Sequence, residues 1–233
     1  MPDKFTVTIG EEGVTAIAYR TAKKSSSSSL ILGHGAGTGQ TSGFMVSFAE
    51  ALAERGVNIV TFNFLYAEQG RSVPDRTDKL EQCYRAVIDA VRADRTLSKN
   101  GVAVGGKSMG GRIASQVVAS GVSDIAGLVF LGYPLHPPGK PEQLRSKHLQ
   151  LIKTPMLFVQ GSRDSFGTPA ELRDVLKKPE AAASKALPSN LTIHEVEDGD
   201  HSFKVPKSTA PQAEVYARIQ DEIARWLKGL KKI

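Results

Sequence analysis

The chain has 233 residues, of which 40% are hydrophobic and 23% charged, enough apolar material for the core of one large α/β domain. Its 30 basic and 24 acidic side chains give a net charge of +6. The basic residues are dispersed along the chain, so nucleic-acid binding is not expected as the main activity. A single cysteine excludes an intramolecular disulfide and a cysteine-rich metal site.

Short apolar runs alternate with amphipathic stretches, a rhythm typical of helices that cover a mostly parallel sheet. The expected strands are 5–9, 14–19, 30–32, 57–62, 102–104, 125–131, 155–160 and 191–196. The expected helices are 44–55, 78–93, 110–120, 170–177 and a C-terminal helix from residue 212. No break in the alternation divides residues 1–233, which are predicted to form a single domain.

Three further features follow from the same pattern. The serine run 25–29 is expected to be a short loop, and Cys83 a buried thiol on the apolar side of helix 78–93. The connection 133–153 has room for a short helix over the site but not for a large cap domain. The N-terminus has no signal-peptide pattern and no apolar run is long enough to span a membrane, so a soluble cytoplasmic protein is expected.

The stretch after the strand at 102–104 is the most informative one. Gly106, Ser108 and Gly110 fit the pattern G-x-S-x-G, placed after an apolar strand and before a helix. This context is typical of a nucleophile elbow, a strained strand-to-helix turn that presents a serine above the sheet. The start of the following helix favours negative charge on a substrate oxygen.

Two other glycine-rich patterns offer alternatives. Gly101 and Gly106-Lys107-Ser108 also spell the P-loop pattern G-x-x-x-x-G-K-[ST]. A P-loop requires its strand before the first glycine, whereas the apolar residues here lie between the glycines. The glycines of loop 33–43 do not satisfy the dinucleotide pattern G-x-G-x-x-G in any register. Nucleotide binding is therefore disfavoured on both counts.

The loop that follows the strand at 30–32 begins with Gly33-His34-Gly35-Ala36. A strand followed by His-Gly fits an oxyanion loop, in which a backbone N–H faces the substrate oxygen. The N–H groups of Ala36 and Met109 are the expected donors. A plain glycine-rich connection remains the alternative for this loop.

The order of the remaining polar residues tests the elbow interpretation. α/β-Hydrolases present a serine, an acid and a histidine in that order, each after a strand. Asp164 follows strand 155–160, and His201 follows strand 191–196. Asp198 and Asp200 are too close to His201 in sequence to hold the imidazole easily from behind, so Asp164 is the preferred acid.

The residues quoted above belong to a set of motifs that resemble the dienelactone-hydrolase-like α/β-hydrolases. The similarity is greatest to a small group that includes testis-expressed protein 30 and a larger chromatin-complex subunit. The motifs that carry it are Gly33-His34-Gly35-Ala36-Gly37, Phe62-Asn63-Phe64-Leu65-Tyr66, Gly105-Gly106-Lys107-Ser108-Met109-Gly110-Gly111-Arg112, Leu131-Gly132-Tyr133-Pro134-Leu135-His136-Pro137-Pro138-Gly139-Lys140, Gly161-Ser162-Arg163-Asp164 and Gly199-Asp200-His201-Ser202-Phe203. The resemblance implies a hydrolase without a settled substrate. Leu65 departs from the proline expected in this group, which leaves the substrate shape open.

These observations predict a serine hydrolase with an α/β-hydrolase fold that uses Ser108, Asp164 and His201 on a small-molecule acyl substrate. No cofactor and no metal are required. The residues expected to contact the substrate are His34, Gly35, Lys107, Tyr133 and His136. Lys107 either favours an anionic substrate or points into solvent. The alternative function is a non-catalytic interaction module that retains the hydrolase fold.

Overall fold

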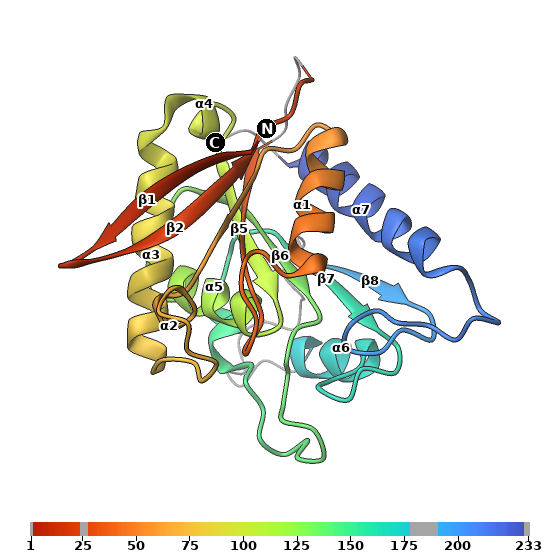
Figure 1. Ribbon diagram of the computed structural model, residues 1–233. Coiled ribbons are helices and arrows are strands. Elements are labelled where there is room, and N and C mark those ends of the chain that lie inside the picture. Colours follow the sequence, from red (N-terminus) through yellow and green to blue (C-terminus); the bar gives the residue numbers. More distant parts are fainter. Residues whose placement is uncertain (1, 24–27, 178–190, 231–233) are drawn as a thin grey trace.

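A single sheet of eight strands organises the computed structural model, which describes residues 2–23, 28–177 and 191–230 (Figure 1). The strand order is β1-β2-β4-β3-β5-β6-β7-β8. Strands β1 and β2 form an antiparallel hairpin, β2 is antiparallel to β4, and all other neighbours are parallel. The strands are β1 (Asp3–Ile9), β2 (Glu12–Tyr19), β3 (Ser29–Gly33), β4 (Ile59–Phe62), β5 (Val102–Lys107), β6 (Ile125–Leu131), β7 (Met156–Gly161) and β8 (Leu191–Val196).

Helices cover both faces of this sheet (Figure 1). Helices α1 (Gly43–Glu54) and α7 (Gln212–Gly229) share a buried apolar cluster on one face. Helices α3 (Thr77–Ala93) and α5 (Met109–Ala119) share another cluster on the opposite face. The remaining helices are the short α2 (Leu65–Glu68), α4 (Arg95–Ser98), α6 (Pro169–Lys177) and the 3₁₀ helix η1 (Lys147–Leu151). The architecture confirms the predicted α/β-hydrolase fold.

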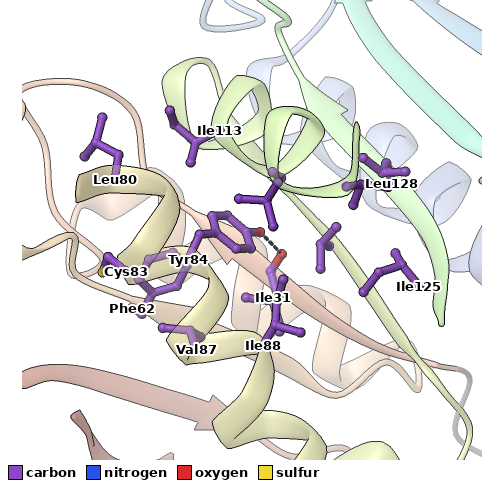
Figure 2. Close-up of a cluster of buried hydrophobic side chains, with 14 of the residues drawn as sticks. Ile31, Phe62, Leu80, Cys83, Tyr84, Val87, Ile88, Ile113, Ile125 and Leu128 are labelled. Carbon is purple, nitrogen blue, oxygen red and sulfur yellow. Dashed lines mark hydrogen bonds between the residues drawn. The ribbon is translucent and has the colours of Figure 1, made fainter. Parts of the chain in front are cut away.

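The hydroxyl of Tyr84 is a polar anchor within the cluster under α3 (Figure 2). This oxygen lies 3.0 Å from the carbonyl oxygen of Ile31 in β3 and 2.6 Å from that of Gly105 in β5. It also accepts a hydrogen bond from the Gly105 N–H at 3.0 Å. The fully buried phenol therefore ties α3 to the two strands that lead to the oxyanion loop and the elbow.

Cys83 lies next to this anchor and is 1% exposed, which confirms the prediction of a buried thiol (Figure 2). Burial raises the pKa of this thiol to about 12. A thiolate is the reactive form of cysteine, so the environment of Cys83 suits a structural side chain.

The structure differs from the expected elements mainly at short segments. Strand β5 continues to Lys107, because glycines at 105 and 106 let the backbone stay extended between crowded neighbours. Helices α2 and α4 were not expected, since four residues are too few to show helical periodicity. Connection 133–153 contains only η1. Of the serine run, residues 25–27 lie outside the described residues, while Ser29 already belongs to β3.

Among the helices of the described ranges, none combines the length and the apolar character that a membrane crossing requires.

Candidate active site

Ser108 stands alone between strand β5 and helix α5, in a backbone conformation that serine rarely adopts. Its φ is 49° and its ψ is −112°. The turn is tight because β5 and α5 approach β3 closely. A Cβ atom at Gly106 or at Gly110 would lie only 2.3 or 2.2 Å from the carbonyl oxygen of Gly33. Glycine is therefore required at both positions, and the structure has the strained strand-to-helix turn that the sequence predicted around Ser108.

The same geometry shows that the P-loop alternative is wrong. Residues 102–107 form strand β5, so the chain between Gly101 and Gly106 is extended and hydrogen-bonded to neighbouring strands. A P-loop needs an irregular loop there, whose N–H groups surround a phosphate.

Ser108, His201 and Asp164 form one hydrogen-bonded chain. The Ser108 Oγ lies 2.9 Å from His201 Nε2, and His201 Nδ1 lies 2.8 Å from Asp164 Oδ2 and 3.0 Å from Oδ1. A carboxylate only accepts hydrogen bonds, so the partners assign the proton of a neutral imidazole to Nδ1 and leave Nε2 as the acceptor for the serine. The side chain of Asp164 is fully buried, whereas that of His201 is 19% exposed.

Further contacts hold the Asp164 carboxylate in place. The Phe166 N–H donates to Oδ1 at 2.8 Å, and the Gln160 amide donates to Oδ2 at 2.8 Å. Gln160 is fully buried and also accepts a hydrogen bond from the Tyr133 N–H at 2.8 Å. Sequence reasoning missed Gln160, although a glutamine near the end of an otherwise apolar strand was a usable signal.

The alternative acids, Asp198 and Asp200, form hydrogen bonds within the loop that carries His201 and not with its imidazole. Asp200 Oδ1 accepts hydrogen bonds from the N–H groups of Ser202 and Lys204, at 2.7 and 2.9 Å. Asp198 Oδ2 accepts a hydrogen bond from the hydroxyl of Thr209 at 2.8 Å. Both carboxylates thus brace the turn that carries His201.

Lys107 points neither freely at a substrate nor into solvent. Its Nζ donates a hydrogen bond to the backbone carbonyl of His201 at 2.7 Å, and this links β5 to the histidine loop. Burial lowers the pKa of Lys107 to about 8, against the attraction of Asp164 and Asp200. The side chain lines the cavity, but its charged end is already engaged.

The loop after β3, the expected oxyanion loop, is fixed from behind by His34, which is fully buried. Its Nε2 accepts a hydrogen bond from the Phe64 N–H at 3.1 Å, and its Nδ1–H donates to the Gly35 carbonyl at 2.8 Å. The Thr38 hydroxyl donates to the same carbonyl at 3.0 Å. The C=O and N–H of a trans peptide point in opposite directions. These contacts therefore turn the Ala36 N–H away from His34 and Thr38.

A cavity of about 650 Å³ opens over Ser108. Gly35, Ala36, Lys107 and Met109 line it, as the sequence predicted. Met109 is the first residue of α5, so its N–H has no partner within the helix. The rest of the wall comes from Thr38, Ser42, Phe44, Met45, Pro74, Asp75, Thr77, Leu80, Arg112, Pro134, Arg145, Phe166, His201, Ser202, Lys204 and Tyr216.

Three residues expected to contact the substrate are absent from this wall. His34 is buried behind the oxyanion loop, and Tyr133 is fully buried with its hydroxyl bonded to the Arg145 carbonyl. His136 is 5% exposed, with Nδ1 bonded to the Pro137 carbonyl and Nε2 at 3.4 Å from Glu171. The structure therefore places all three away from the cavity wall, because each side chain is turned toward a partner within the protein.

Comparison with known proteins places this geometry in context. Residues 26–228 match the family model described as "Alpha/beta hydrolase domain". A dienelactone hydrolase from Anabaena variabilis has a similar structure, with a TM-score of 0.73 and 16% identity over 99% of both chains. An alpha-beta serine hydrolase homologue from Coxiella burnetii gives a TM-score of 0.72 and 18% identity over 96% of both chains.

An esterase from Pyrococcus furiosus is similar with a TM-score of 0.74 and 17% identity, over 97% of this chain and 92% of the esterase. Identities this low show a common fold alone. The narrower resemblance to the group of testis-expressed protein 30 stays a prediction. The family match covers most of the sequence and includes the elbow, the acid and the histidine, so the chain belongs to the alpha/beta hydrolase domain family.

Proposed function

We propose that the protein is a serine hydrolase, of the carboxylesterase type, that cleaves an ester or related acyl bond in a small molecule. One observation carries the proposal, the hydrogen-bonded chain from Ser108 through His201 to Asp164 at a strained elbow. The cavity over Ser108 and the similarity in fold to serine hydrolases and esterases support it. No cofactor enters the proposed reaction.

In the first half-reaction the Ser108 Oγ attacks the acyl carbonyl carbon while His201 Nε2 accepts the hydroxyl proton. Asp164 stabilises the resulting imidazolium and keeps the proton of Nδ1 in place. The N–H groups of Ala36 and Met109 stabilise the negative oxygen of the tetrahedral intermediate, an effect of about 3–4 kcal/mol per donor. The intermediate expels the alcohol, which takes its proton from Nε2, and leaves an acyl-serine.

In the second half-reaction water attacks the acyl-serine, and His201 Nε2 accepts a proton from that water. The second tetrahedral intermediate expels the Ser108 oxygen, which recovers its proton from Nε2. The products are a carboxylic acid and the free enzyme.

The protonation state of His34 supports the proposed oxyanion loop. Burial lowers the pKa of His34, which favours the neutral ring that accepts a hydrogen bond from the Phe64 N–H and holds the loop.

A fluorophosphonate probe tests the proposal, because it phosphonylates activated serines. We expect labelling of the native protein and its loss in Ser108→Ala. Ser115→Ala is the matched control, since Ser115 also contacts a histidine, His148, at 2.7 Å but is fully buried. Labelling should persist in that variant. Absence of labelling in the folded native protein would contradict the proposal and favour the non-catalytic interaction module.

A further inference from the structure

Two arginines face the cavity from different parts of the chain. Arg112 lies one helical turn beyond the elbow, because its N–H donates to the Ser108 carbonyl at 3.1 Å. Arg145 comes from connection 133–153, which reaches across to the same wall. Both side chains are partly buried. Both arginine residues therefore line the same cavity as Ser108.

Arg145 is held in this place by its own backbone. The hydroxyl of the fully buried Tyr133 donates to the Arg145 carbonyl at 2.8 Å. The Arg145 N–H in turn donates to the Leu135 carbonyl at 2.8 Å. These two bonds close connection 133–153 on itself and bring a second positive charge to the cavity.

The positive charges of this pair are unmatched. Among the residues that the structure describes, neither Arg112 nor Arg145 forms an ion pair. Arg112 donates one hydrogen bond, to the Gln116 amide oxygen at 3.2 Å. Burial lowers the pKa of Arg112, and the neighbouring charge of Arg145 lowers it further, while Tyr133 and then Glu81 raise it.

The other charged groups on the wall do not cancel the pair. Asp75 also lines the cavity, but its Oδ1 already accepts a hydrogen bond from Arg71 at 2.7 Å. Lys107 adds positive charge, with its Nζ bonded to the His201 carbonyl, and Lys204 adds more at an exposed position. The cavity is thus positive on the side of α5.

We propose that Arg112 and Arg145 form an anion subsite beside Ser108, so that the substrate is an ester or related acyl compound that also carries a carboxylate or phosphate group. Each guanidinium offers a planar set of N–H donors that fits two oxygens of such a group. Binding there would anchor the substrate while its acyl carbon lies at Ser108. This inference rests on the proposed function for its reaction, but the anion subsite itself can be measured without catalysis.

Calorimetry on the inactive Ser108→Ala protein measures anion binding alone, with glutarate and inorganic phosphate as probes. We expect at least one of the two to bind, and Arg112→Gln or Arg145→Gln in the same background to weaken binding about tenfold or more. Arg95→Gln is the matched control, because Arg95 is exposed on α4 and lies outside the cavity wall. It removes the same charge and should leave binding unchanged. A preference for glutarate identifies a carboxylate subsite and a preference for phosphate a phosphate subsite.

Lysine at position 112 or 145 keeps the charge but loses the paired donors, so these variants should bind with intermediate affinity and replace any glutamine variant that does not fold. Absence of binding by both anions, or equal weakening by Arg95→Gln, would overturn the subsite. If the fluorophosphonate labels the protein but anion binding does not change on substitution of either arginine, the proposed function stands and the anion subsite is wrong. If anions bind through both arginines but the fluorophosphonate does not label the protein, the anion subsite stands and the proposed function is wrong.

Discussion

Helix α5 is associated with two serine–histidine contacts that are almost equally short. At its start Ser108 Oγ lies 2.9 Å from His201 Nε2, and within it Ser115 Oγ lies 2.7 Å from His148 Nε2. The surroundings of the two contacts differ. Ser108 opens onto a cavity of about 650 Å³, whereas Ser115 is fully buried in the packing between α5 and η1.

The protons run in opposite directions in the two contacts. The Ser115 hydroxyl donates its one proton to the Arg112 carbonyl at 2.6 Å, so His148 Nε2 must donate to Ser115. A histidine that donates through Nε2 is no base for that serine. His201 donates through Nδ1 to Asp164 and therefore accepts from Ser108 through Nε2. A short serine–histidine distance is thus insufficient evidence for a nucleophile, and the partner of the second ring nitrogen decides.

Asp164→Asn is expected to have the largest effect on activity, because it should make the Ser108–His201 contact resemble the Ser115–His148 contact. An asparagine amide stabilises the wrong tautomer of His201, so ester hydrolysis should fall by about 10⁴-fold in kcat while the fold is retained. The measurement is the rate of hydrolysis of a neutral 4-nitrophenyl ester. Asp200→Asn is the control, because Asp200 braces the loop through Ser202 and Lys204 and should cost far less. An equal loss in both variants would argue against Asp164 as the partner of His201.

Tyr84→Phe tests whether the Tyr84 hydroxyl stabilises the strands that lead to the Ser108–His201 contact. The Tyr84 hydroxyl bridges β3 and β5, the strands that end at the oxyanion loop and the elbow. Its removal leaves buried backbone groups without a partner and should lower the free energy of unfolding by about 1–3 kcal/mol. Urea denaturation measures the change. Tyr66→Phe is the matched control, because the Tyr66 hydroxyl is also buried but forms no hydrogen bond to the described residues of β3 or β5. A similar loss in both variants would contradict the bridging role.

The contact between Ser115 and His148 should make the free energy of unfolding depend on pH. Burial, and then the charge of Arg112, lower the pKa of His148 to about 4 from its ordinary value near 6.5. Between these values the unfolded chain binds a proton that the folded protein does not, so stability falls as the pH falls from about 6.5 to about 4. Because His148 is only partly buried, we expect this contribution to be about 1–2 kcal/mol.

His148→Asn should make the free energy of unfolding depend less on pH between about 6.5 and about 4. The free energy of unfolding in urea, measured at pH 7 and pH 5 for both proteins, gives the two slopes. If the native protein and the variant lose the same stability between these two values, His148 does not carry the effect.

Much of the site was accessible from sequence because parallel strands bring their carboxyl ends to one edge. Ser108, Asp164 and His201 each follow such a strand, so their order along the chain predicted that they meet. The contacts of Gln160, His34 and Arg145 were not accessible in this way. They join side chains to backbone groups far away in sequence, and no periodicity encodes such partners.

By itself the sequence determined the alternation of strands and helices, because burial of one face of each element imposes its apolar period. It also determined the elbow, because only glycine at 106 and 110 leaves room for the Gly33 carbonyl. The order of residues along the chain singled out His201, but tertiary structure alone decided which partners each histidine ring has. Packing sets which ring nitrogen meets a carboxylate, a carbonyl or a hydroxyl, and burial then shifts the proton equilibrium. His34 became the support of a loop, His148 a partly buried donor, and His201 the hydrogen-bond acceptor for the Ser108 hydroxyl.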